Sequence, residues 1–467
     1  MIVKANNLIV LSRLDICSKI PLVRAWESGV DERWGRELYF AYLSRIKPSN
    51  GFNQDSDKTS LEDYYLSFRA LYESMKNSGF LSHYGLIPVH GNSPTNGAHR
   101  IAIASVLGLD IETEQTNESP HIYDYKFMRT IGLSETFSDA LMNEFLLINS
   151  NLRVFCLMGI PKNSQLEIQE FINMRRKICF KKVIELTEIG KRRMMEVLYG
   201  FHDWWDQELL ETLSLERFNY NDHSITLIYI EAGTLEDDMQ LKADIRNMFM
   251  LGTLHKKVHS TDNKCDLLRL SRIALNQNSI HFLNTSPIGA ETNIIEKCKQ
   301  MRILKGLDLD DIAIDGSATL EMYGLRKARD IDVVAKGDVW SMKQDKSFHN
   351  YDYENNFLKP NDIVMDPRCH FLWDEFKFIS LPSLLSYKAF RGEEKDWKDL
   401  ALVQSAYGGM KLYADIGHEH RAKVFRIMLF LRNKTEVILS VFPSPLASIV
   451  RKTYKKIRIC YRSLRSG

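Results

Sequence analysis

Apolar residues between positions 60 and 79 recur at three- and four-residue spacing, which predicts an amphipathic helix. Ser60 stands where a helix N-cap is expected, acidic residues follow it in the first turn, and Gly79 ends the pattern. The apolar stripe comprises Tyr64, Phe68, Leu71, Tyr72 and Met75. The hydrophilic stretch 47–60 before this helix is predicted to be a loop.

A short strand, a turn-rich loop and an alanine-rich helix are predicted next, between residues 86 and 109. Residues 119–149 then predict a linker helix followed by a packing helix. Because strand and helix patterns alternate through this first part of the chain, residues 1–135 are expected to form a separate α/β unit.

The stretch between residues 136 and 300 also alternates between strand-like and helical patterns. A buried strand is predicted at 223–233 and a helix at 237–249, and another strand and helices precede them. Residues 255–284 predict a short strand, a polar turn, a helix and a final strand over 279–284. This β-α-β alternation predicts a second α/β domain.

Two clusters in this middle region allow alternative interpretations. The first is a polar cluster within residues 255–262. It lies where a strand meets a helix N-terminus, a position that binds ligands in α/β folds, so it could hold a phosphate or a sugar. Alternatively, one of its residues at 260–262 caps the helix and its second histidine is a satisfied strand-end residue. The cluster comprises His255, His259, Ser260, Thr261 and Asp262. The sequence His-Asp-Trp-Trp-Asp at 202–206 either offers a stacking surface for a sugar or anchors packing.

The most informative stretch runs from Ile314 to Gly337. Asp330 and Asp332 lie two residues apart in an apolar run, so strand geometry would place both carboxylates on one face. The Gly316-Ser317 turn precedes them; glycine lets the backbone approach a phosphate, and the serine hydroxyl can bind its oxygens. Mg²⁺ is commonly held by one or two carboxylates plus phosphate oxygens. The pattern therefore predicts a site for Mg²⁺ and a nucleoside triphosphate, the alternative being a solvated edge strand.

Residues 300–405 resemble the nucleotidyltransferase superfamily that includes DNA polymerase β and the MNT-type enzymes. Gly316, Ser317, Asp330 and Asp332 match its Gly-Ser and Asp-x-Asp signature, and the flank 376–403 matches the segment that follows in bacterial members. The resemblance implies that the two aspartates hold the metal and the nucleotide.

The same resemblance implies a third carboxylate on the next strand, which would help to activate the attacking hydroxyl. Asp362 and Asp366 are the candidates, with Asp374 as a further one. Lys388, on the helix that follows, could stabilise the charge that develops during transfer. A domain without the third carboxylate would bind a nucleotide without transferring it.

The segment Asn96-Gly97-Ala98-His99-Arg100 resembles the mark of the ParB/sulfiredoxin family, and a Leu-Gly pair ends its helix as in that family. The first position departs from the family's acidic residue, which puts a metal or acid role for Asn96 in doubt. Backbone N–H groups, an imidazole and a guanidinium at a helix N-terminus suit a phosphate. We therefore expect Asn96, Gly97, His99 and Arg100 to line a nucleotide or anion pocket; the alternative is that His99 and Arg100 make only structural hydrogen bonds.

Composition narrows the class of protein. The chain has 467 residues, enough for two to four domains, with 44% apolar and 26% charged residues and a net charge of +2. The seven cysteines are scattered without a CxxC pair, so neither a zinc site nor a disulfide framework is expected. No apolar run reaches membrane-spanning length and the start is not a convincing signal peptide, so we expect a cytoplasmic protein.

The last segment carries seven cations and no acidic residue from Arg451 on, with an apolar stripe at helical spacing. Such a helix suits the anionic inner face of a cell membrane, although docking on its own core and binding to nucleic acid are alternatives. We otherwise expect no nucleic acid partner, because no helix-turn-helix with a basic recognition face is present. The overall layout resembles proteins of bacterial capsule and lipopolysaccharide loci.

The sequence thus predicts an α/β (mixed α+β) multidomain protein. The parts are a ParB/sulfiredoxin-like domain at 1–135, an α/β domain at 136–300, a nucleotidyltransferase-like domain at 301–412 and a helical tail at 413–467. The expected function is Mg²⁺-dependent transfer of a nucleoside monophosphate to a small-molecule or glycan acceptor, with a protein acceptor second. The alternatives are an ATP-dependent small-molecule or sugar kinase centred on the first domain, and a non-catalytic membrane-associated scaffold for glycan assembly.

Overall fold

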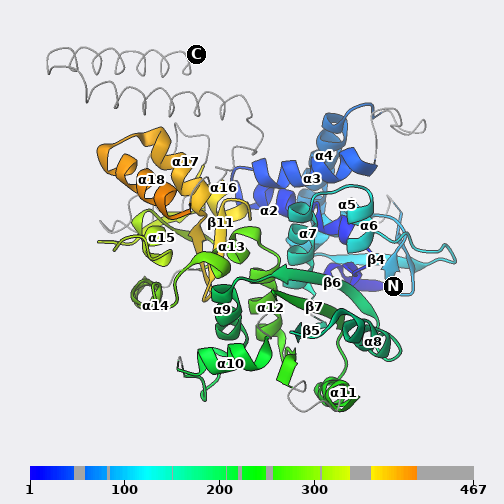
Figure 1. The fold of residues 1–467 in the computed structure, drawn as a ribbon. Helices are drawn as coiled ribbons and strands as arrows, with labels where there is room; N and C mark the ends of the chain where they lie inside the picture. The colour runs from blue at the N-terminus through cyan, green and yellow to red at the C-terminus, as the bar shows by residue number, and fades with distance from the viewer. Residues whose placement is uncertain are drawn as a thin grey trace, which may run out of the picture. The chain divides into compact units, whose positions relative to one another are not determined.

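The protein has the mixed α/β character that the sequence predicts (Figure 1). Its described residues form three four-stranded sheets. The computed structural model describes residues 1–46, 58–80, 85–149, 151–206, 208–218, 223–248, 256–305, 308–336 and 359–407. The chain divides into a compact unit, Met1–Ala406, and a second unit, Tyr407–Gly467. The predicted basic tail at 413–467 and His255 lie outside the described residues, and the boundaries predicted within the first unit stay predictions.

The first sheet has the strand order β1-β4-β2-β3. Its strands are β1 (Ile2–Lys4), β2 (Ile87–His90), β3 (Ser93–Pro94) and β4 (Asp110–Gln115). The helices around it are η1 (Ala5–Leu8), α1 (Leu14–Cys17), α2 (Ile20–Ser28), α3 (Arg33–Ile46), α4 (Leu61–Ser78), α5 (Ala98–Leu107), α6 (Tyr125–Thr130) and α7 (Glu135–Ile148). The predicted helix after residue 60 is confirmed: Ser60 and Asp63 form a reciprocal capping box and Gly79 follows its last turn.

The middle sheet is antiparallel throughout, with the order β6-β7-β5-β8. Its strands are β5 (Leu152–Met158), β6 (Ile178–Glu185), β7 (Ser224–Glu231) and β8 (Val258–Ser260). The helices of this part are α8 (Lys162–Asn173), α9 (Glu188–Tyr199), α10 (Leu209–Arg217), α11 (Leu235–Met248) and α12 (Lys264–Ala274). Apolar side chains of α8 and α11 pack on one face of β5 and β7, while the Tyr229 hydroxyl reaches Ser271 of α12 from the other.

Two predictions for the middle region are wrong. Residues 279–284 belong to a helix, α13 (Gln277–Thr285), and not to a strand; the Asn276 side chain caps it by accepting from the Ser279 N–H. A run of six residues is too short for its periodicity to separate strand from helix. Helix α12 is capped by Asn263, so none of the residues 260–262 is its cap. Thr261 pairs with Val154 of β5 instead.

The third sheet has the order β10-β9-β12-β11. Its strands are β9 (Ile312–Asp315), β10 (Asp332–Ala335), β11 (His370–Trp373) and β12 (Phe376–Ile379). Strand β9 runs antiparallel to β10 and parallel to β12. The helices are α14 (Thr292–Lys305), α15 (Ser317–Met322), α16 (Pro360–Met365), α17 (Leu381–Arg391) and α18 (Glu394–Tyr407). Among the described residues, none of the helices combines the length and the apolar character that crossing a membrane requires.

His370 of β11 is buried and is expected to make the fold sensitive to acid. Its Nδ1 lies 2.8 Å from the Ile363 carbonyl oxygen, and burial, together with the charges of Lys377 and Arg272, lowers its pKa to about 3. In an unfolded chain the pKa is about 6.5. Unfolding therefore takes up a proton between these values, so the stability contributed by neutral His370 is present above pH 6.5 and is lost as the pH falls.

Between pH 7 and pH 5 this loss amounts to about 2 kcal/mol. His370→Gln is expected to flatten the decline of the unfolding free energy over this range, as measured by urea denaturation. His223→Gln is the matched control because His223 is 60% exposed. Equal flattening in both variants would show that burial of His370 is not the cause.

Candidate functional site

The turn between β9 and α15 admits only glycine at position 316. Gly316 has φ 68° and ψ −135°, and a Cβ atom added there would collide with Oδ2 of Asp332. The antiparallel register pairs Asp332 with Asp315, the last residue of β9. The carboxylate of Asp332 thus lies directly against the predicted Gly-Ser turn, although the two are fifteen or more residues apart in sequence.

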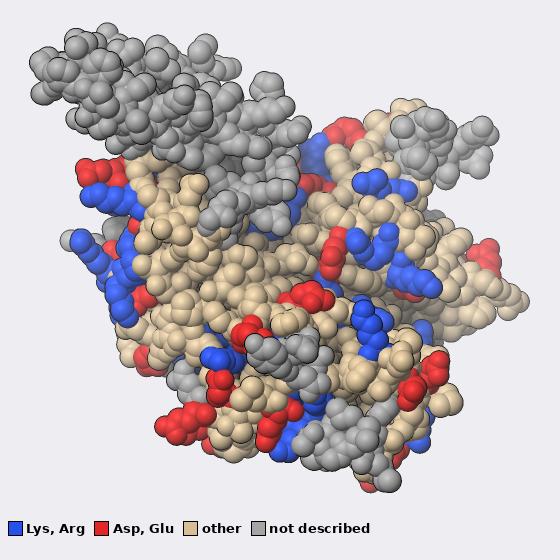
Figure 2. Space-filling view, in the orientation of Figure 1, with Lys and Arg blue, Asp and Glu red and all other residues tan. Residues whose placement is uncertain are grey.

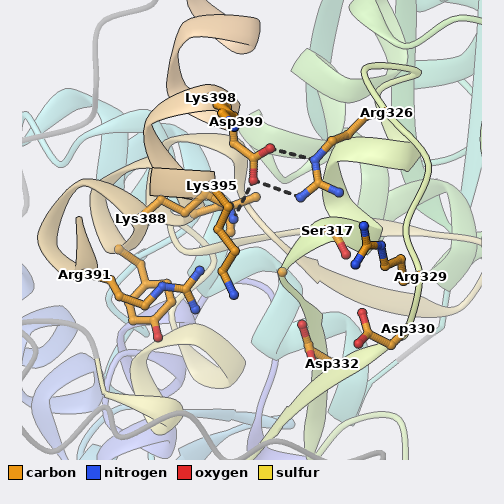
Figure 3. Close-up of a pocket in the computed structure, with 13 residues that line it drawn as sticks. Ser317, Arg326, Arg329, Asp330, Asp332, Lys388, Arg391, Lys395, Lys398 and Asp399 are labelled. Atoms are coloured by element: carbon orange, nitrogen blue, oxygen red, sulfur yellow. Dashed lines mark hydrogen bonds and ion pairs between the residues drawn. The ribbon is translucent and has the colours of Figure 1, made fainter. Parts of the chain in front are cut away.

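A pocket of about 630 Å³ opens beside this turn and brings together five of the residues predicted for the nucleotidyltransferase-like domain (Figure 3). Gly316, Ser317, Asp330, Asp332 and Lys388 all line it. Six cations contribute to its wall: Arg326, Arg329, Lys388, Arg391, Lys395 and Lys398. Figure 3 shows Ser317, Asp330 and Asp332 on one side of the pocket, opposite the side chains from α17 and α18.

The prediction that both aspartates belong to one strand is wrong for Asp330. Strand β10 begins at Asp332, which is 5% exposed, whereas Asp330 is exposed and precedes the strand. The reason is the register: β9 ends opposite Asp332 and turns away at Gly316, so the residues before Asp332 have no strand to pair with.

Lys388 is held by carboxylates from the following helix. Its Nζ lies 2.8 Å from Asp399 and 3.4 Å from Asp396, and all three residues are buried. Arg391 also pairs with Asp396, at 2.5 Å. Much of the positive charge of Lys388 is therefore balanced by these aspartates. The exposed cations Lys395 and Lys398 are better placed to bind an anionic ligand.

The structure does not bring the proposed third carboxylate to the pocket. Asp362 lies in α16 and Asp366 caps its C-terminus, so neither is on a strand, and neither lines the pocket. A helix is favoured there because Pro360 stands in its first turn and the Asp362 carboxylate accepts a hydrogen bond from the Lys359 N–H. Asp374 lies in the turn after β11, where it pairs with Lys299. Strand β12, the neighbour of β9, contains no carboxylate.

Asp362 and Asp366 instead join α16 to the first part of the chain. Arg33 pairs with Asp362 at 2.6 Å, and burial raises the pKa of Asp362 to about 6. Arg368 contacts Asp366 at 2.6 Å and Glu37 through two bonds of 2.7 Å. These interactions are structural ones between α3 and the segment around α16.

The pocket offers ligands of the kind that Mg²⁺ prefers, but not a complete set. Among the described residues, no group of three or more aspartate, glutamate, histidine or cysteine side chains could hold a metal ion. The carboxylates of Asp330 and Asp332 and the Ser317 hydroxyl line one pocket, and the third carboxylate there, Asp399, is paired with Arg326 and Lys388. Hard oxygen donors of this type hold Mg²⁺ together with phosphate oxygens. The residues therefore fit an ion that arrives with a nucleotide rather than a resident metal.

A second pocket, of about 740 Å³, contains Asn96, Gly97, His99 and Arg100 as predicted. Gly97 has φ 84° and stands at the N-cap of α5, which has no side-chain cap. His99 Nε2 lies 2.8 Å from the Tyr39 hydroxyl, and burial, with the charge of Lys19, holds the pKa of His99 well below its usual range. Arg100 donates to the carbonyl oxygen of Gly85.

Buried charged residues that the sequence analysis missed form the floor of this second pocket. Arg13 donates two hydrogen bonds to Asp15, at 2.8 and 3.0 Å. Lys19 donates to the Asp15 carbonyl oxygen at 2.7 Å and lies over the Tyr42 ring. Burial lowers the pKa of Lys19 to about 8. Nothing in the local pattern of residues 13–19 connects them with a loop eighty residues later.

The two clusters of the middle region lie beside each other. Trp204 is 52% exposed and its ring stacks on His202 at 5.3 Å, while Tyr199 contacts both Trp204 and His259. Burial and nearby cations hold the pKa of His259 well below its usual range. The ring contacts join the two clusters, and both interpretations of residues 202–206, a sugar-stacking surface and a packing anchor, stay predictions.

Comparisons of the chain with protein-family models, with curated proteins and with solved structures gave no match. The resemblances to nucleotidyltransferases, to ParB/sulfiredoxin proteins and to proteins of surface-polysaccharide loci therefore stay predictions.

Proposed function

We propose that the protein is a Mg²⁺-dependent nucleotidyltransferase whose site is the pocket at Gly316. The observation that supports this most is the approach of the Asp332 carboxylate to a turn that only glycine can form. A carboxylate, a close backbone and several cations then share one pocket, which is the combination that a metal-bound polyphosphate requires.

In this proposal Asp330 and Asp332 would hold Mg²⁺, which would neutralise negative charge on the phosphates when bound. Gly316 lets the Asp332 carboxylate lie against the turn, and Ser317 donates to a phosphate oxygen beside it. Lys395 and Lys398 of α18 lie across the pocket, where they can contact the same polyphosphate. An acceptor oxygen attacks the α-phosphorus, the bond to the β-phosphate oxygen breaks and pyrophosphate leaves. The third carboxylate of the pocket lining, Asp399, is paired with Arg326 and Lys388, so the acceptor's proton passes to solvent.

We propose a small-molecule or glycan acceptor, as in bacterial surface-polysaccharide synthesis at the inner face of the cell membrane. On the face shown in Figure 2, basic and acidic side chains are interspersed over the described residues. A mixed surface of this kind offers little attraction for a long polyanion, so nucleic acid is not the proposed acceptor.

A second candidate places a nucleotide in the pocket at α5, as a kinase-like unit. The observation in its favour is the buried Lys19 beneath a helix N-terminus that no side chain caps. In that case the Gly316 pocket would sense a nucleotide without transferring it, which agrees with the absence of a carboxylate from β12.

The test is calorimetric titration of ATP, CTP, GTP and UTP with Mg²⁺ into the wild type and into an Asp330→Ala, Asp332→Ala double variant. We expect one nucleotide to bind and the double variant to lose it, while the control variant Asp374→Ala retains it. Release of pyrophosphate from the bound nucleotide then distinguishes transfer from sensing. Unchanged binding in the double variant would refute the proposal and favour the pocket at α5.

A further inference from the structure

Asp330 reaches the pocket on a short irregular segment, residues 323–331, which connects α15 to β10. Among the described residues, no hydrogen bond is made by the Asp330 side chain, so its position depends on how this segment is held. The first anchor is Glu321, a buried residue of α15. It accepts from the Ala328 N–H and pairs with Lys327 at 3.3 Å. This anchor is local, because it ties the segment to the helix that precedes it.

The second anchor comes from the other side of the pocket. Arg326 donates two hydrogen bonds to Asp399 of α18, from Nε at 2.6 Å and from Nη2 at 2.9 Å. Figure 3 shows this pair together with the contact between Asp399 and Lys388. Asp399 is 3% exposed, and its two cationic partners hold its pKa below its usual range although burial raises it. One carboxylate thus connects the segment that carries Asp330 with α17 and α18.

A contribution to stability alone does not explain this arrangement well. The Arg326 side chain is 35% exposed, and Asp399 has a second cationic partner, Lys388, at 2.8 Å, so Arg326 is not needed to keep a buried carboxylate from being unpaired. A bidentate pair does, however, fix both the distance and the orientation of its two partners. Arg326 lies four residues before Asp330, so fixing it restricts where the second carboxylate can stand relative to Asp332.

We infer that Asp399 is a positioning residue for the metal site: through Arg326 it holds the segment 323–331 so that Asp330 stays beside Asp332. The inference rests on the proposed function of this pocket. It also assigns a second role to α18, which contributes Lys395 and Lys398 to the same pocket. Helix α18 would then both bind the polyphosphate and help to position the metal ligand Asp330. Binding of the nucleotide and binding of the metal would therefore be coupled.

The test uses Mn²⁺ as a spectroscopic substitute for Mg²⁺. The dissociation constant of Mn²⁺ is measured by electron paramagnetic resonance, with the α,β-methylene analogue of the nucleotide that the wild type binds. Arg326→Gln is expected to raise this constant at least tenfold, and Asp399→Asn to do the same. Arg326→Lys, which keeps the charge but not the two-bond geometry, is expected to recover only part of the affinity.

Glu37→Gln is the matched control, because it also breaks a bidentate pair with an arginine, Arg368, but away from the pocket. Its midpoint of thermal unfolding is expected to shift about as much as that of Arg326→Gln, without a change in Mn²⁺ affinity. If the wild type binds Mn²⁺ and Arg326→Gln binds it equally well, the inference is wrong and the proposed function survives. If the wild type does not bind Mn²⁺ with any nucleotide, both fail.

Discussion

Asp332→Asn is expected to lower the rate of nucleotidyl transfer at least roughly a hundredfold. Asn keeps the shape of the side chain but removes the charge that faces the Gly316 turn. A metal at such a site supplies several kcal/mol of charge stabilisation in the transition state, and each 1.4 kcal/mol corresponds to a factor of ten in rate. The measurement is pyrophosphate release at saturating nucleotide, with the midpoint of thermal unfolding recorded for each variant.

Asp362→Asn and Asp366→Asn serve as controls for this prediction. Both residues resemble catalytic carboxylates in sequence, yet both pair with arginines outside the pocket. We expect these two variants to retain transfer and to differ from the wild type mainly in stability. The proposed site would be refuted if Asp332→Asn kept full activity, and the structural role of Asp362 would be refuted if its variant alone lost transfer.

The elements that could be predicted from sequence are those whose signals are local. The capped helix α4 is an example, because Ser60, Asp63 and Gly79 mark both of its ends within twenty residues. The Gly-Ser turn is another, since the backbone conformation at Gly316 itself requires glycine. In both cases the residues that decide the structure stand next to the structure they decide.

The elements that could not be predicted depend on contacts made far along the chain. Helix α13 carries an apolar run that would suit a strand, but its Phe282 ring stacks on Phe371 of β11. The side-chain amides of its N-cap, Asn276, and of Asn278 also donate to the carbonyl oxygen of His370, the first residue of β11. The residues missed in the pocket at α5 have the same cause, because Lys19 is far from residues 96–100 in sequence and meets them only in the folded chain.

Arg193→Met is expected to lower the free energy of unfolding by about 3–5 kcal/mol, the largest loss of stability that we predict. Arg193 lies on α9 with its side chain fully buried. It donates to Glu291 at 2.8 and 3.0 Å and to the Ser286 carbonyl oxygen at 2.9 Å. Its guanidinium also lies over the rings of Phe282 and Trp373. Removing it leaves a buried carboxylate and several acceptors without their donor. Urea denaturation measures the loss.

The comparison that isolates burial is Arg192→Met, one residue earlier on the same helix. The Arg192 side chain is 39% exposed and its partner Glu211 is 56% exposed, so this variant is expected to change stability by less than about 1 kcal/mol. A double variant, Arg193→Met with Glu291→Met, separates charge from geometry. If the unpaired carboxylate causes the loss, the double variant recovers much of it, because no charge remains buried. If the double variant is no more stable than the single one, the lost hydrogen bonds to the segment after α13 are the cause, and Arg193 acts mainly by joining α9 to that segment.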